Sequence, residues 1–264
     1  MSKILIFGAG AMGGAIISGC LAKGVWNAAD VFVVEHNEAA TKEKAATYGI
    51  REGQISDAKD ADLVIVAVKP NVVPDILKEI SPMKPRRVLS IAAAVTVAAL
   101  EGNLPEGTEV VRVMPNTPAS VGEGMAAITG GTHSSEDFLK EAETIFNALG
   151  KAAVVTERQL DELGALSGAG PGYAFVIIDA LSDAGVRIGL PRQLAIEAAA
   201  QTLYGAAKMV LETGKHPAQL RDQVTSPGGT TIAGIHAMEQ KGLRAALIDG
   251  VVACLARSDE MSGK

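Results

Sequence analysis

Short apolar runs alternate with helical patterns over the first 150 residues of the chain. Runs rich in β-branched residues occur at 3–7, 31–34, 62–68, 87–91, 110–114 and 125–129. Continuous apolar runs of this kind are typical of strands buried on both faces of a parallel sheet. The segment between 135 and Gly150 has a helical apolar face, with Gly150 as its expected end. The alternation predicts an α/β fold with a doubly wound, mostly parallel sheet.

Strand patterns stop near residue 160, and long alanine-rich helical patterns follow. Residues 173–188 are apolar around much of the helix, with Asp183 and Arg187 at helical spacing for a pair. Further helices are expected at 191–213 and 243–257. The predicted organisation is a dinucleotide-binding domain at 1–158 and an all-helical substrate-binding and dimerisation domain at 159–264. Because these helices present so many small and apolar positions, we expect a homodimer.

A glycine pattern joins the first predicted strand to the first helix. The third glycine allows close packing of helix on strand, while the first makes a tight turn and the second lets a diphosphate approach the backbone. The free N–H groups at the helix start would hold that diphosphate. The pattern therefore predicts a Rossmann-type nucleotide site, whose residues are Gly8, Ala9, Gly10, Ala11, Met12 and Gly13.

A carboxylate follows the second predicted strand. Glu35 lies 22 residues after Gly13, where an acidic side chain usually binds the adenosine ribose 2′-hydroxyl and repels the 2′-phosphate of NADPH. Its charge favours NADH. A solvated glutamate is the alternative, and Lys42 and Lys44 could accommodate a phosphate, so both NADH and NADPH stay open.

Three further strand ends carry candidate cofactor contacts, because ligands of open parallel sheets lie beyond the carboxyl ends of the strands. Small residues after the fourth run would leave room for a flat ring, and Asn116 could hydrogen-bond a carboxamide. Ordinary turn residues are the alternative. The candidates are Val68, Lys69, Pro70, Asn71, Ala92, Ala93 and Asn116.

One segment of the second half is not explained by packing. A glycine-rich turn opens a helix and is flanked by hydroxyl residues, which indicates a site for a small anion. An ordinary threonine N-cap is the alternative, but it needs only one hydroxyl. The candidate substrate residues are Ser226, Gly228, Gly229, Thr230 and Thr231. A nucleotide domain joined to an anion site suggests hydride exchange with a small acid.

Composition excludes several other classes of protein. Of 264 residues, 48% are hydrophobic and 3% aromatic, and the net charge is −6, which disfavours nucleic-acid binding. Two cysteines and four histidines without ligand spacing predict no metal and a reducing compartment, the cytoplasm. The uncharged stretch 4–22 could be a signal peptide, but its glycines disfavour one. The apolar run at 88–100 is too short to span a bilayer, so no membrane partner is expected.

The motifs together resemble the pyrroline-5-carboxylate reductase family, collinearly over essentially the whole chain. The resemblance rests on the glycine pattern and on the segments 68–70, 114–118, 166–173 and 226–231, of which the last is the most specific. It implies NAD(P)H-dependent reduction of 1-pyrroline-5-carboxylate to L-proline, the last step of proline biosynthesis.

The resemblance also implies roles for individual residues. The glycine turn, the loop at 68–71, Ala92, Ala93 and Asn116 would line the cofactor. Ser226, Thr230 and Thr231 would hold the substrate carboxylate and ring nitrogen, with Thr231 as the catalytic hydroxyl nearest that nitrogen. Family members form dimers of interlocked helical domains, often within a decamer. The chain departs from the family at Glu35, since many members prefer NADPH, and at Ala169 and Gly172, where Ser and Ala are common.

Other functions remain open at this point. A β-hydroxyacid dehydrogenase would place a catalytic lysine where this chain has Val176. An imine reductase for another substrate would share the same motifs. A non-catalytic NAD(P)H-sensing protein would bind nucleotide but lack a working anion site.

Overall fold

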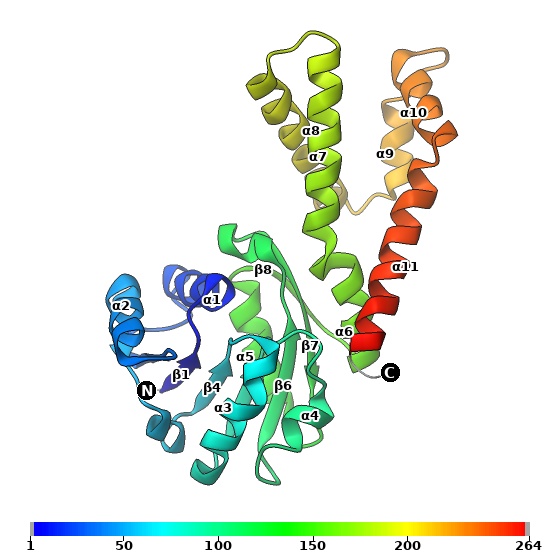
Figure 1. Cartoon of the computed structure of the whole chain (residues 1–264). Helices are drawn as coiled ribbons and strands as arrows, with labels where there is room; N and C mark the ends of the chain where they lie inside the picture. Colours follow the sequence, from blue (N-terminus) through cyan, green and yellow to red (C-terminus); the bar gives the residue numbers. More distant parts are fainter. Residues whose placement is uncertain (1–2, 262–264) are drawn as a thin grey trace. The chain divides into compact units, whose positions relative to one another are not determined.

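The computed structural model describes residues 3–261, and its contacts divide the chain into two compact units (Figure 1). The first unit comprises Met1–Ala169 together with Cys254–Lys264, and the second comprises Gly170–Ala253.

The first unit is built on one sheet whose described strands follow the order β3-β2-β1-β4-β5-β6-β7-β8. Neighbouring strands are parallel except β6 and β7, which confirms the predicted mostly parallel sheet. The chain order reverses at β1, with β2 on one side and β4 on the other, which is where such sheets bind ligands. The strands are β1 (Ile4–Phe7), β2 (Val31–Val34), β3 (Arg51–Glu52), β4 (Leu63–Val66), β5 (Arg87–Ser90), β6 (Glu109–Met114), β7 (Gly124–Gly130) and β8 (Gly150–Val154).

Helices cover both faces of the sheet because successive strand residues point to opposite faces. Within β1, Ile4 and Ile6 join the core under α1, α2 and α5, whereas Leu5 and Phe7 join the core under α3 and α4. The helices of this unit are α1 (Ala11–Ala22), α2 (Glu38–Tyr48), α3 (Val73–Ile80), α4 (Val97–Glu101), α5 (Glu136–Asn147) and α6 (Glu157–Leu163).

Two of the described strands were not predicted from the sequence. β3 has two residues, both exposed and charged, so it carries no apolar signal. β8 lies at the edge of the sheet and is only partly buried. The expected role of Gly150 is wrong, since α5 ends at Asn147 and Gly150 opens β8 with a φ of +147°. A Cβ there would overlap the backbone of Gly124, so close strand pairing requires this glycine.

The second unit is helical and contains small-residue contacts. Gly185 on α7 lies so close to α8 that an added Cβ would be 2.8 Å from the Ala195 Cβ. The expected pair of Asp183 with Arg187 is wrong: Asp183 instead pairs at 2.7 Å with Arg192, which also donates to the Ser182 hydroxyl. Helices in or entering this unit are α7 (Gly170–Arg187), α8 (Arg192–Thr213), α9 (Pro217–Gln223), α10 (Thr230–Gln240) and α11 (Leu243–Met261).

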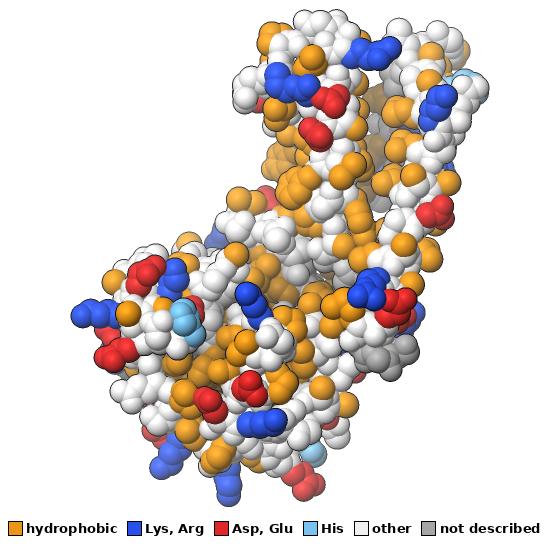
Figure 2. Space-filling model, viewed as in Figure 1, with side chains coloured by type: hydrophobic (Ala, Val, Ile, Leu, Met, Phe, Trp, Pro, Cys, Tyr) orange, Lys and Arg blue, Asp and Glu red, His pale blue; other side chains and the backbone are white. Residues whose placement is uncertain are grey.

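Many large apolar side chains of this unit are exposed in the single chain (Figure 2). Val176 on α7 is 70% exposed and Leu211 on α8 is 74% exposed. By length and composition, the helical stretch Glu157–Arg187 could cross a membrane, and only 6% of its most apolar window is buried. Such surfaces call for a partner, since isolated soluble chains rarely expose continuous apolar faces.

Candidate active site

The three glycines Gly8, Gly10 and Gly13, at the junction of β1 and α1, occupy distinct environments. Gly8 has a φ of +91°, and a Cβ on it would lie 2.8 Å from the Ala67 carbonyl oxygen. A Cβ on Gly13 would overlap the Gly8 carbonyl oxygen. A Cβ on Gly10 would meet open space. The outer two glycines therefore shape the turn, and the middle one leaves room for a ligand to approach the backbone.

The amino end of α1 offers uncompensated N–H groups. Gly10 occupies the N-cap position without a side-chain hydrogen bond, and the first turn carries no acidic residue. Free N–H groups and the positive end of the helix dipole together favour an anion. This end of the loop therefore suits a diphosphate.

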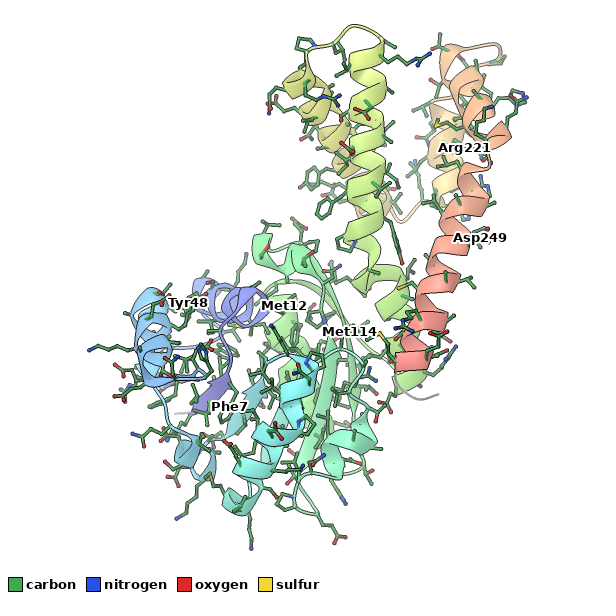
Figure 3. All side chains as sticks on the ribbon, in the orientation of Figure 1. Phe7, Met12, Tyr48, Met114, Arg221 and Asp249 are labelled. Atoms are coloured by element: carbon green, nitrogen blue, oxygen red, sulfur yellow. The ribbon has the colours of Figure 1, made fainter. Side chains whose placement is uncertain are left out.

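Two cavities flank the glycine loop. A cleft of about 580 Å³ runs across the carboxyl ends of β2, β1 and β4 and is lined by Gly8, Glu35, Val68 and Lys69. A more open hollow of about 420 Å³ lies along α1 and α2 and is lined by Ala9, Gly10, Ala11, Lys44 and Tyr48, among others. Figure 3 labels Phe7, Met12 and Tyr48 in this region. The fold thus brings three separate stretches of predicted cofactor residues to one edge of the sheet.

Glu35 is held in place rather than freely solvated. Its carboxylate accepts a hydrogen bond from the Ala9 N–H at 2.6 Å, and its side chain is 16% exposed. Its own N–H donates to the Thr41 hydroxyl at 2.9 Å. Lys44 lines the other hollow and pairs with Glu43, so it does not neutralise Glu35.

The strand ends on the other side of β1 are tightly organised. Ala92 is buried after β5, and its N–H donates to the Ser90 hydroxyl. Ala94 has a φ of +60°, a left-handed conformation that costs roughly 1–2 kcal/mol for a residue other than glycine. Strained backbone of this kind tends to occur where a ligand is bound.

The Asn116 side chain makes two hydrogen bonds within the fold that could not be predicted from the sequence. Its amide donates to the Ser167 carbonyl at 2.9 Å and accepts from the Met125 N–H at 2.9 Å. Ser167 belongs to a π-helical turn, Gly164–Gly168, which packs on Met114. Asn116 therefore ties the end of β6 to this turn, and π turns inside helices frequently occur at functional sites.

A cluster of buried charged residues was also not predicted from the sequence. Arg112 on β6 is 1% exposed and pairs at 2.9 Å with both Glu157 and Asp161 of α6. Glu157 also accepts from the Val97 N–H at 2.7 Å. The available signal was an arginine inside the apolar run 110–114, since buried arginines require partners.

The predicted anion segment precedes α10. Gly229 is the N-cap of this helix and no side chain caps it, so the structure does not show an ordinary threonine N-cap. Gly228 has a φ of +68° and faces open space, and the Gly229 N–H donates to the Ser226 carbonyl at 3.0 Å. Ser226, Thr230 and Thr231 are exposed in the single chain. Free N–H groups and three hydroxyls are thus available to a small anion.

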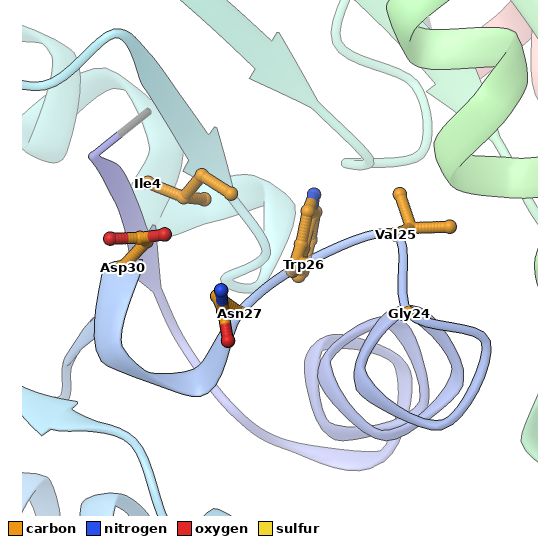
Figure 4. Close-up of a pocket in the computed structure, with 6 residues that line it drawn as sticks. All are labelled: Ile4, Gly24, Val25, Trp26, Asn27 and Asp30. Atoms are coloured by element: carbon orange, nitrogen blue, oxygen red, sulfur yellow. The ribbon is translucent and has the colours of Figure 1, made fainter. Parts of the chain in front are cut away.

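Another hollow lies away from these residues. It has a volume of about 360 Å³ and is lined by Ile4, Trp26 and Asp30, among others (Figure 4). Ile4 and Asp30 lie at the amino ends of β1 and β2, opposite the glycine loop.

Burial raises the pKa of the nearby core thiol Cys20 to about 12, which removes it as a thiolate nucleophile. Within residues 3–261, no group of three or more His, Cys, Asp or Glu side chains could hold a metal ion.

Comparisons with known proteins cover the whole chain. Residues 157–261 match a family described as pyrroline-5-carboxylate reductase dimerisation, and residues 3–94 match NADP oxidoreductase, coenzyme F420-dependent. The chain is 41% identical over 266 residues to the pyrroline-5-carboxylate reductase of Methanosarcina acetivorans, covering 99% of the chain and 98% of that protein. It is 40% identical to the Arabidopsis thaliana protein of the same name, covering 98% and 95% of the two chains.

Solved structures of pyrroline-5-carboxylate reductases also superpose on the chain. A pyrroline-5-carboxylate reductase from Coxiella burnetii superposes with a TM-score of 0.93 at 34% identity, covering 99% of this chain and 98% of that chain. The pyrroline carboxylate reductase of Plasmodium falciparum, solved with NADP bound, superposes with a TM-score of 0.87 at 28% identity, covering 99% and 98%.

Proposed function

Since the chain belongs to the pyrroline-5-carboxylate reductase family, we propose that its glycine loop holds the nucleotide and its Ser226–Thr231 segment holds the substrate of that reaction. The chain is an NAD(P)H-dependent oxidoreductase of proline biosynthesis, which reduces 1-pyrroline-5-carboxylate to L-proline. Full-length similarity to these reductases excludes the β-hydroxyacid dehydrogenase and sensor alternatives.

The nucleotide assignment follows the geometry of the loop. The residues from Gly8 to Gly13 would bind the diphosphate, because Gly10 faces open space at an uncapped helix start. Glu35 would bind the ribose at the end of β2. The other assigned contacts lie at the ends of β4, β5 and β6, namely Val68, Lys69, Pro70, Asn71, Ala92, Ala93 and Asn116.

The substrate assignment rests on the uncapped start of α10. Its free N–H groups and the hydroxyls of Ser226 and Thr230 would bind the carboxylate of the cyclic imine. The Thr231 hydroxyl would hydrogen-bond the ring nitrogen. A protonated imine is already electrophilic, so its reduction needs positioning more than a strong acid. The nicotinamide, when bound, supplies the hydride to the imine carbon.

The helical half of the chain includes a dimerisation domain, which gives the exposed apolar faces of α7 and α8 a protein partner. We propose a homodimer of interlocked helical domains and assembly of these dimers into a decamer. The proposed boundary at 158/159 is supported by the start of the dimerisation match at residue 157. Because the only cysteines are free thiols, we place the enzyme in the cytoplasm.

A direct assay tests the proposal. Oxidation of NADH or NADPH is followed by absorbance after 1-pyrroline-5-carboxylate is added. We expect turnover with the wild-type chain and a roughly 10²–10³-fold lower kcat/KM for Thr231→Ala, the range for losing a polar or proton-handling contact. Thr231→Ser keeps the hydroxyl and should recover most of the activity. Equal kcat/KM for Thr231→Ala and wild type would remove Thr231 from the mechanism, and no turnover with either nucleotide would overturn the proposed function.

A further inference from the structure

We infer that the adenosine end of the nucleotide site selects NADH over NADPH, through a fixed carboxylate at the end of β2 and a self-capped helix α2. This inference rests on the proposed function, because it concerns which nucleotide the glycine loop receives. The two nucleotides differ only in the 2′-phosphate of the adenosine ribose, so selectivity must arise where that group would lie.

The first observation is that Glu35 cannot easily turn away from the cleft. Its carboxylate is bound to the Ala9 N–H at 2.6 Å, which attaches it to the diphosphate loop itself. Its backbone is fixed as well, because its N–H donates to the Thr41 hydroxyl at 2.9 Å. A 2′-phosphate would therefore meet a stationary negative charge, and like charges placed together at a binding interface cost several kcal/mol. A ribose 2′-hydroxyl can instead donate to the same carboxylate.

The second observation is independent of Glu35 and concerns α2. A helix start next to the ribose would be the natural binding place for a 2′-phosphate, because its N–H groups favour anions. Here the Asn37 side chain already accepts from the Ala40 N–H at 2.8 Å. Glu38 in the first turn adds a negative charge that satisfies the helix dipole. The start of α2 is therefore already capped by Asn37 and already has a negative charge from Glu38.

The nearby cations do not compensate for these carboxylates. Lys42 on α2 is exposed and lines neither of the two cavities. Lys69 lines the same cleft but follows β4, whose backbone lies two strand spacings, roughly 10 Å, from that of β2. Its side chain makes no ion pair with Glu35 among the described residues. Lys44 lines the other hollow and pairs with Glu43. His36 is mostly exposed, and its Nδ1 lies 3.7 Å from the second Glu35 oxygen, so its ring already lies against that carboxylate.

Binding measured by calorimetry tests the inference without relying on turnover. The dissociation constants of NADH and NADPH are determined for the wild-type dimer and for Glu35→Gln, which keeps an acceptor for the Ala9 N–H but removes the charge. We expect the wild type to bind NADH at least about tenfold more tightly, and Glu35→Gln to lower this ratio by about tenfold. Glu35→Ser, which also removes bulk, should lower it further.

Glu52→Gln is the matched control, because this exposed carboxylate on the adjacent strand β3 does not line the cleft. Its NADH to NADPH ratio should equal that of the wild type. Tighter binding of NADPH by the wild type, or an unchanged ratio in Glu35→Gln, would overturn the inference while leaving the proposed reductase intact. Binding of neither nucleotide would instead contradict the proposed function.

Discussion

Gly10 is the N-cap of α1 and Gly13 lies in its first turn, and the two have different physical reasons for lacking a side chain. At Gly13 the obstacle is protein backbone, since a Cβ would overlap the Gly8 carbonyl oxygen. At Gly10 the protein leaves space empty, so the obstacle would be the bound diphosphate. Stability and nucleotide affinity should therefore respond separately to substitution at these two residues.

We predict that Gly10→Ala leaves the free energy of unfolding nearly unchanged and weakens nucleotide binding by about tenfold or more, because its Cβ enters the ligand space. Gly13→Ala should destabilise the fold by about 1–3 kcal/mol, the usual cost of overpacking, although alanine is the better helix former. Urea denaturation and calorimetric titration measure the two effects. The interpretation would fail if Gly10→Ala bound nucleotide like the wild type, or if Gly13→Ala were as stable as the wild type.

At the scale of elements, the cluster of Arg112, Glu157 and Asp161 fixes α6 to β6. The arginine and Asp161 are almost completely buried, and both pairings are 2.9 Å long. The Asn116 amide makes a second connection from the end of β6, to the π turn after α6. Strand β6 therefore fixes α6 and the π turn that follows it within the first unit.

We predict that Arg112→Met lowers the free energy of unfolding by about 3–5 kcal/mol, because it removes the cation facing buried Asp161. Arg112→Met combined with Asp161→Leu should recover much of this loss, since replacing a whole buried ion pair by apolar groups is often neutral. Arg158→Met, which breaks exposed ion pairs with Glu162 and Asp259, should have little effect. Equal unfolding midpoints for the Arg112 and Arg158 variants would contradict a special role of the buried cluster.

At the scale of the whole molecule, the helical unit is incomplete as a single chain. Its described helices bury few residues of their own, whereas Phe175 and Val176 on α7 and Leu211 on α8 are mostly exposed. Burying one such side chain contributes about 1.5–3 kcal/mol. We therefore expect dimerisation to supply the core that this half of the chain lacks.

We predict that Val176→Glu converts the dimer into a monomer at micromolar concentration, because the new carboxylate would be buried in an apolar interface. Light scattering measures the mass in solution. Lys140→Glu places the same carboxylate on an exposed position of α5 and should leave the dimer intact. A dimeric Val176→Glu protein would show that the α7 face around Val176 lies outside the interface.

The sequence by itself determined the local features of this protein. The glycine spacing, the apolar strand runs and the Ser226–Thr231 segment each act within a few residues, so six strands, the loop between β1 and α1 and the family could all be predicted. Tertiary structure alone decided features that join distant residues: the hydrogen bond from Ala9 to Glu35, the pairing of Arg112 with Asp161, and the bridge from Asn116 to Ser167. It also created β3, whose charged residues form a strand only because β2 provides backbone partners. Such contacts depend on which elements the fold brings together. A local sequence pattern does not encode the distance in space between residues that are far apart in the chain.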